Sequence, residues 1–302
     1  MKKKIVVFII SLAAVVSCAF GFSACEGATP SESSSSDSST PIESGSSGGS
    51  GSVDGSAPDE NKTPELQDLL VDFEYTQTET ECIITGLKDK TVTKIVIPDQ
   101  VTGIADCAFE ECDYLMSVVV GNGVTSIGED AFVGCYRLVE VFNMSSHITV
   151  EKGSEEHGEI AHYALAVYNS DSGVTESKLL DDNGYIVYTE GAERILVGYT
   201  GKETDLVLPS YITKINPYAF YASDDLTSVE IPNEVTSIGA FAFDCCDYLM
   251  EIIFRDTTTW YRTYNASNWE NKTGGEEIDF TDSYRNVELF YEYYYYYNFY
   301  KL

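Results

Sequence analysis

Apolar and polar residues alternate with a period of two in two short segments of the chain. The apolar positions are Leu115, Val118 and Val120 in the first segment, and Leu226, Val229 and Ile231 in the second. Such alternation predicts a strand that buries one face. A proline or a glycine follows each of four such strands, namely Pro98, Gly121, Pro209 and Pro232. Neither residue type continues a central strand easily, so each predicts the end of its strand.

These strands belong to a short repeat. A shift of 23 places Ile104 on Ile127 and Phe220 on Phe243, and four coils follow the template L-x-x-V-x-I-P-x-x-V-T-x-I-x-x-x-A-F-x-x-C-x-x. Units this small bury their apolar side chains by stacking, which predicts a repeat solenoid, mainly β, with short helical turns at A-F-x-x-C. We expect the phenylalanines of this motif to stack on one another. The predicted structural core of the repeats is Ile104, Phe109, Cys112, Leu115, Ile127, Phe132, Cys135, Leu138, Ile215, Phe220, Leu226, Ile238, Phe243, Cys246 and Leu249.

A second, longer period relates two blocks of coils to each other: Ile104 recurs as Ile215, and Ile127 as Ile238. A pair of apolar segments precedes each block: Phe73–Tyr75 with Glu81–Ile84, and Tyr185–Tyr188 with Arg194–Val197. Each pair predicts a β-hairpin that covers the open end of its stack. Asp181-Asp-Asn-Gly184 resembles part of a calcium loop, but the ligand order of an EF-hand is missing, so its Asn-Gly pair predicts a tight hairpin turn.

The repeat pattern divides the folded part of the chain into four segments. We predict a hairpin plus the first repeat block at 64–142 and an irregular segment at 143–183. A hairpin plus the second block follows at 184–254, and an aromatic C-terminal cap at 255–302. In the irregular segment, the apolar spacing from Ile160 to Leu165 predicts one degenerate coil with an insertion.

The N-terminal residues predict export and lipidation. Three lysines and the apolar run Ile5–Phe22 are typical of an export signal. The run ends in Phe22-Ser-Ala-Cys25, which resembles the lipobox of bacterial lipoproteins, so we predict a signal peptide at 1–24 and a lipid anchor on Cys25. Cys18 also fits the pattern, and an uncleaved membrane helix is a further alternative.

The segment after the predicted signal cannot form a core. Residues 25–63 are rich in serine, glycine and acidic residues, and such a composition predicts a disordered linker. A lipid at its start would tether the folded part to the outer face of the membrane in a bacterial cell envelope, and the linker would carry that part away from the membrane.

The repeat template resembles that of the BspA-type leucine-rich repeat family, whose members carry a strand, IP, VTxIG, AFxxC and leucine in this order. The match covers Val92–Phe142 and Leu206–Phe254. The resemblance implies a bacterial surface or secreted protein, often lipid-anchored, and some members of the family work as adhesins. It brings no catalytic residues.

The charge of the chain narrows the choice of partners. Loss of three lysines with the predicted signal leaves 15 basic against 49 acidic residues, a net charge of −34. This charge repels phosphate, which argues against nucleic acid and against binding an anionic lipid surface. The expected partner is a macromolecule at the cell surface, protein or glycan, with a membrane contact only through the N-terminal lipid. We expect the protein to be a monomer.

The residues most often used in catalysis and metal binding are few. His147, His157 and His162 are the three histidines, they match no HExxH pattern, and no CxxC pair is present. We therefore predict no catalytic residue, no metal and no cofactor, and the protein is not expected to be an enzyme. An enzyme hidden in the irregular segment, using these histidines, is the alternative.

Six cysteines remain outside the predicted signal and anchor. Cys112, Cys135 and Cys246 share a repeat position that Ser223 fills in another coil, so we expect them to be buried structural thiols. The state of Cys82, Cys107 and Cys245 stays open.

Two regions are candidate binding surfaces. Side chains of the strand face are where a macromolecular partner is expected: Met116, Ser117, Glu140, Thr227, Ser228 and Glu251. The aromatic C-terminal region, with Trp260, Trp269 and the tyrosine-rich stretch Leu289–Leu302, either stacks on sugars or caps the solenoid. The sequence therefore predicts a non-catalytic binding or adhesion module, with a carbohydrate-binding accessory module as the alternative.

Overall fold

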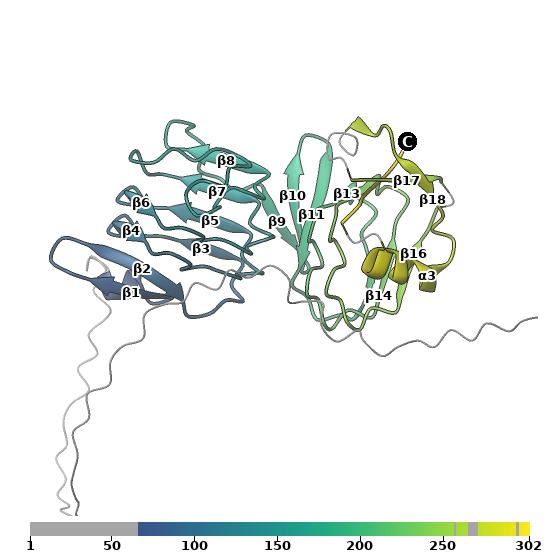
Figure 1. Ribbon diagram of the computed structural model, residues 1–302, viewed down its shortest axis with the longest axis horizontal. Helices are drawn as coiled ribbons and strands as arrows, with labels where there is room; N and C mark the ends of the chain where they lie inside the picture. Colours follow the sequence, from purple (N-terminus) through teal and green to yellow (C-terminus); the bar gives the residue numbers. More distant parts are fainter. Residues whose placement is uncertain (1–65, 257, 265–270, 294–295) are drawn as a thin grey trace, which may run out of the picture. The chain divides into compact units, whose positions relative to one another are not determined.

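The computed structural model describes residues 66–256, 258–264, 271–293 and 296–302 (Figure 1). The chain forms two units, Met1–Val71 and Asp72–Leu302. Of the first unit the structure describes a short helix, α1 (Leu66–Leu69). The predicted signal peptide, the anchor Cys25 with its alternative Cys18, and the linker lie outside the described residues. No helix in the described part is long and apolar enough to cross a bilayer.

The second unit is a β-solenoid of about seven coils, and each coil carries one strand of a parallel sheet. The sheet of the first block contains β3 (Lys94–Val96), β5 (Ser117–Val120), β7 (Glu140–Asn143) and β8 (Ala166–Asn169). That of the second block contains β12 (Asp205–Val207), β14 (Ser228–Ile231) and β16 (Glu251–Phe254). Ser117 pairs with Glu140, and Ser228 with Glu251, each one repeat further along the chain. The predicted repeat solenoid is therefore confirmed.

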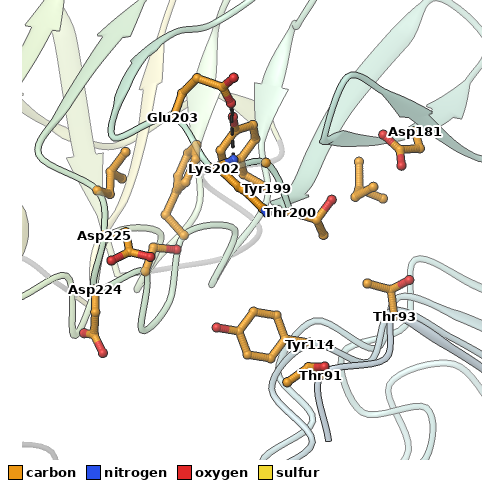
Figure 2. Close-up of a pocket in the computed structure, with 15 residues that line it drawn as sticks. Thr91, Thr93, Tyr114, Asp181, Tyr199, Thr200, Lys202, Glu203, Asp224 and Asp225 are labelled. Carbon is orange, nitrogen blue, oxygen red and sulfur yellow. Dashed lines mark hydrogen bonds between the residues drawn. The ribbon is translucent and has the colours of Figure 1, made fainter. Parts of the chain in front are cut away.

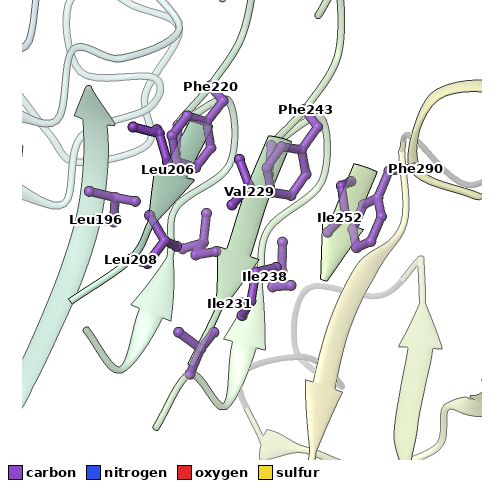
Figure 3. Packing of buried hydrophobic residues seen from close by; sticks show 14 of the residues in the cluster. Leu196, Leu206, Leu208, Phe220, Val229, Ile231, Ile238, Phe243, Ile252 and Phe290 are labelled. Carbon is purple, nitrogen blue, oxygen red and sulfur yellow. The ribbon is translucent and has the colours of Figure 1, made fainter. Parts of the chain in front are cut away.

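Short strands form a second ladder beside each of these sheets. They are β4 (Gly103–Ile104) and β6 (Ser126–Ile127) in the first block, and β13 (Lys214–Ile215) and β15 (Ser237–Ile238) in the second. Each pairs in parallel with its neighbour one coil away. The core lies between the two ladders, and Figure 3 shows it for the second block.

The phenylalanines of the repeat stand above one another in two short columns. The ring centroids of Phe109 and Phe132 lie 4.8 Å apart, and those of Phe220 and Phe243 lie 5.2 Å apart with nearly parallel planes. Phe290 closes the second column edge-on at 5.2 Å (Figure 3). The predicted stacking of equivalent side chains is confirmed.

The A-F-x-x-C segments form hydrogen-bonded turns instead of regular helix. The Cys112 amide donates to the Phe109 carbonyl at 3.2 Å, and the thiol of Cys135 donates to the same carbonyl from the next coil at 3.1 Å. One residue before the turn has a positive φ in each of four coils: Cys107, Asp130, Tyr218 and Phe241. This strained conformation recurs because alternate amides of the turn, such as that of Phe109, bond to the next coil.

The irregular segment contains one longer coil. Glu140 in β7 pairs with Ala166 in β8, three positions later than a regular coil would place it. The Asn143 side chain donates to the Asn169 side chain at 2.8 Å, and Asn169 in turn donates to the Val150 carbonyl. This coil thus contains three residues more than a regular one.

Both predicted hairpins are present. The first consists of β1 (Phe73–Gln77) and β2 (Cys82–Leu87), and the second of β10 (Tyr185–Glu190) and β11 (Glu193–Tyr199). β2 pairs in parallel with β4, and β11 with β13, so each hairpin extends the short-strand ladder of its block. A further strand, β9 (Leu179–Asp182), joins β10 through Asn183 and Gly184, both at positive φ. The Asn-Gly turn is confirmed.

The C-terminal residues cap the second block. They form β17 (Trp260–Thr263), β18 (Glu276–Ile278), α3 (Ser283–Glu288), the π-helical turn η1 (Leu289–Tyr293) and β19 (Asn298–Lys301). β19 pairs antiparallel with β15 of the last short-strand ladder and with β17 on its other side. The described part of the tyrosine-rich stretch, η1 and β19, thus lies beside the last coil of the second block.

Candidate functional site

The predicted repeat-core residues lie in the interior, with one exception. Fourteen of the fifteen are at most 7% exposed, and Ile127 is half-buried. Cys112, Cys135 and Cys246 carry free thiols, as does Cys82. Burial raises the pKa of Cys246 to about 12, so this thiol stays protonated and unreactive at neutral pH.

The predicted partner-binding strip is wrong for the first block. Met116, Ser117 and Glu140 are buried, because the outer face of the second hairpin covers this side of the sheet. The hairpin side chains in the shared cluster are Ile186, Tyr188, Ile195 and Val197. The Glu140 carboxylate accepts hydrogen bonds from the Ser177 hydroxyl and from the Lys178 amide, at 2.9 Å for the amide, which offsets the cost of its burial.

In the second block the equivalent strip remains accessible. We define the open face as Val207, Thr227, Ser228, Met250 and Glu251. Met250 is 63% exposed and Val207 53%, whereas Thr227, Ser228 and Glu251 are half-buried. The hydroxyls of Thr227 and Ser228 donate to Asp205 at 2.7 and 2.8 Å, so this polar part of the face is ordered.

Trp260 cannot play the predicted role in sugar binding. Its side chain is 2% exposed, and its ring lies edge-on to Phe254 and Phe280 at centroid distances of 5.3 and 5.8 Å. The Lys301 ammonium lies 5.4 Å from its ring centroid. No ring face is left for a sugar because Trp260 is part of the core under the cap, and the other candidate, Trp269, lies outside the described residues.

The three histidines form no metal centre. His147 is exposed, whereas His157 and His162 are half-buried, and His162 packs edge-on against Tyr163 at 4.5 Å. Across the described residues, no group of three or more His, Cys, Asp or Glu side chains is placed to hold a metal ion.

The structure contains a cleft of about 440 Å³ that the sequence did not reveal (Figure 2). Its walls come from three separate segments of the chain. The lining residues are Thr91, Thr93 and Tyr114 of the first block, Asp181, Ile186 and residues 199–203 of the second hairpin and its following loop, and Phe220 and residues 223–226 of the second block. No local motif marks these positions, because the fold brings together residues that are far apart in the sequence.

Tyr114 lines the cleft (Figure 2), and the buried guanidinium of Arg137 lies over its ring. Its ring is 37% exposed, and the guanidinium carbon of Arg137 lies 5.3 Å from the ring centroid. Arg137 itself is buried, and it donates to the carbonyls of Tyr218, at 3.1 Å, and of Tyr221. Tyr136 stacks on Tyr218 at 4.4 Å beside it.

The rim of the cleft is acidic. Asp181, Glu203, Asp224 and Asp225 lie around it, against the single cation Lys202. The Tyr199 hydroxyl donates to Glu203, which lowers the pKa of Glu203; burial and the same bond raise the pKa of Tyr199 to about 12.

Comparison with known proteins defines the class to which this repeat solenoid belongs. The family model described as BspA type leucine rich repeat region matches six copies, over residues 87–154 and 199–297. The matched ranges cover more than half of the chain, which therefore belongs to the BspA-type leucine-rich repeat family. Leucine-rich repeat proteins are generally non-catalytic binding modules. No curated protein matches the chain.

Several solved structures are similar over part of the chain. A leucine rich cell surface protein from Faecalibacterium prausnitzii is 16% identical, with 61% of this chain and 75% of that chain covered and a TM-score of 0.30. The leucine-rich repeat protein of T. pallidum is 23% identical, with 61% and 79% covered and a TM-score of 0.27. The pneumococcal vaccine antigen PcpA is 15% identical, with 53% and 50% covered and a TM-score of 0.28.

Proposed function

We propose that this protein is a lipid-anchored, non-catalytic binding module of the bacterial cell surface, and that it binds a protein partner through the open face. The observation that carries the proposal is the seating of a β-hairpin on the equivalent face of the first block. Met116 and Val139 pack there against Ile186 and Val197 of the second hairpin. This repeat therefore already holds a hairpin with apolar side chains in one of its two blocks.

The longer period, which relates the two blocks, makes the comparison direct. Thr227 and Met250 of the second block correspond to Met116 and Val139, and Glu251 corresponds to Glu140. When a partner covers an exposed apolar side chain such as Met250, its burial stabilises the complex by about 1.5–3 kcal/mol if burial is complete. The matching partner is a protein that presents apolar side chains on a hairpin or an extended segment.

A second copy of this chain does not fit the open face. The end hairpin that such a copy would offer presents polar side chains outward, Glu74, Thr76 and Thr85, all of them exposed. These would leave polar groups desolvated against Val207 and Met250. The proposal is thus consistent with the expected monomer.

The binding test measures which envelope proteins the full-length protein and its variants capture from cells that produce this protein. Met250→Glu should abolish capture of a specific protein, because it places a charge in the contact. Val96→Glu is the matched control, because Val96 corresponds to Val207 and is 56% exposed in the first block. Equal capture by wild type and Met250→Glu would contradict the proposal.

The lipid anchor is tested separately. Metabolic labelling with a palmitate analogue should label the wild-type chain and not Cys25→Ala. Labelling that survives Cys25→Ala and is lost in Cys18→Ala would move the anchor to Cys18. Absence of label in the wild type would favour the uncleaved helix.

A further inference from the structure

We infer that the cleft beside Tyr114 is a binding site for a neutral saccharide. This site is distinct from the open face, and it moves the carbohydrate-binding alternative away from Trp260. The inference rests on three features of the cleft: an aromatic platform held in place, polar groups that have no partner in the described part of the chain, and the sign of the local charge.

The platform is the ring of Tyr114. A pyranose presents a face of C–H groups that packs on an aromatic ring, and a ring that is already ordered loses little entropy when a ligand binds. The buried guanidinium of Arg137 lies 5.3 Å from the centroid of the Tyr114 ring, and Arg137 is itself held by two backbone carbonyls. Arg137 thus supports one side of the Tyr114 ring. The ring is partly exposed and lines the cleft (Figure 2).

The polar groups available to sugar hydroxyls surround this platform. In the described part of the chain, the side chains of Thr93, Lys202, Asp224 and Asp225 have no hydrogen-bond or ion-pair partner. Carboxylates accept from hydroxyl donors, and the hydroxyl and ammonium groups donate to sugar oxygens. The cleft volume of about 440 Å³ lies within the range of small-molecule sites, about 300–1,000 Å³.

The charge of the rim selects against anionic sugars. Four carboxylates face one ammonium group, in a chain whose net charge is −31. A uronate or another acidic sugar would bring a further negative charge close to Asp224 and Asp225. The site therefore suits a neutral saccharide, and the carboxylates act as hydroxyl acceptors in it.

The test titrates purified full-length protein with neutral oligosaccharides of glucose, galactose, mannose and N-acetylglucosamine, and with glucuronate and galacturonate oligomers of matched length. Calorimetry should detect binding of at least one neutral sugar and none of the uronates. Tyr114→Ala should weaken that binding at least tenfold, whereas Tyr248→Ala, an exposed tyrosine outside the cleft, should leave it unchanged. The double variant Asp224→Asn, Asp225→Asn should admit the matched uronate, because the amides retain hydrogen bonding without charge.

Further variants keep the inference open to refutation if Tyr114→Ala fails to fold. Asp225→Leu removes an exposed acceptor and should also weaken binding at least tenfold. Met250→Glu, on the open face, should leave saccharide binding intact, so this inference and the proposed function can fail separately. Absence of binding by every neutral sugar would overturn the inference, as would sugar binding that survives Asp225→Leu. Preferential binding of an amine such as spermidine, lost at high salt, would also overturn it.

Discussion

The two hairpins of this molecule have the same strand pairing but lie in different surroundings. Each carries a β-bulge at the same place, between Glu74 and Tyr75 in the first and between Ile186 and Val187 in the second. The outward positions differ in kind. They are Glu74, Thr76, Ile83 and Thr85 in the first hairpin, and Ile186, Tyr188, Ile195 and Val197 in the second.

This difference decides what each hairpin does. The first buries only the face toward its own coils, whereas the second is buried on both faces, with Leu196 in the core of the second block and Val197 in the cluster against the first. A strand buried on both sides carries a continuous apolar run instead of an alternating one. The hairpin that ends a stack therefore has mostly polar outward side chains, and the hairpin that joins two blocks has apolar ones.

The largest expected effect comes from placing a charge on the outward face of each hairpin. Val197→Asp should lower the free energy of unfolding by at least about 3 kcal/mol, because it buries an unpaired carboxylate. The equivalent change Thr85→Asp, at an exposed position, should change it by no more than about 0.5 kcal/mol. Urea unfolding followed by circular dichroism measures both, and equal effects would show that the second hairpin is not buried on its outer face.

A smaller effect is expected at the equivalent pair Glu140 and Glu251. Glu140→Ala should cost about 2 kcal/mol, because it leaves the Ser177 hydroxyl and the Lys178 amide without their acceptor in a buried site. Glu251→Ala should cost less than about 1 kcal/mol, because its partner Ser283 can turn to water at a half-buried position. Urea unfolding measures both changes in the free energy of unfolding. A larger decrease for Glu251→Ala than for Glu140→Ala would contradict the assignment of the covered and the open face.

The smallest effect concerns Asp113, which corresponds to Asp224 of the cleft. Burial raises the pKa of Asp113 to about 6, although Arg137 attracts its charged form. A carboxyl with a raised pKa in the folded state opposes folding when ionised, so its unfavourable contribution is present above pH 6 and disappears as the pH falls toward 4. Asp113→Asn should therefore stabilise the protein at pH 7, by less than about 1 kcal/mol because the side chain is partly exposed, and not at pH 4. Asp224→Asn is the exposed control, and stabilisation by Asp113→Asn at pH 4 alone would contradict this reasoning.

Local patterns predicted the coils, the hairpins and the Asn-Gly turn, because neighbouring residues fix these features. The covered strip at Met116 and Glu140 was missed, since it depends on a hairpin much further along the chain. The apolar run Tyr185–Tyr188 does contain a signal for burial on both faces, and its comparison with Phe73–Tyr75 could have revealed the cover. The composition of the C-terminal region does not indicate that Trp260 is buried. The cleft could not be predicted, because no local sequence pattern marks its residues.

The antiparallel pairing of β19 with β15 also bears on how this protein can change in length over evolution. β19 occupies the edge of the second block's short-strand ladder that a further parallel coil would need, and the first hairpin occupies the outer edge of the first block's ladder. Within each block a coil stacks on the coils before and after it, so duplication of one repeat unit inside either block would leave both terminal elements in contact with the same kind of surface. Natural variation in the number of units should therefore fall between Thr102 and Ile231, and leave both capping elements unaltered.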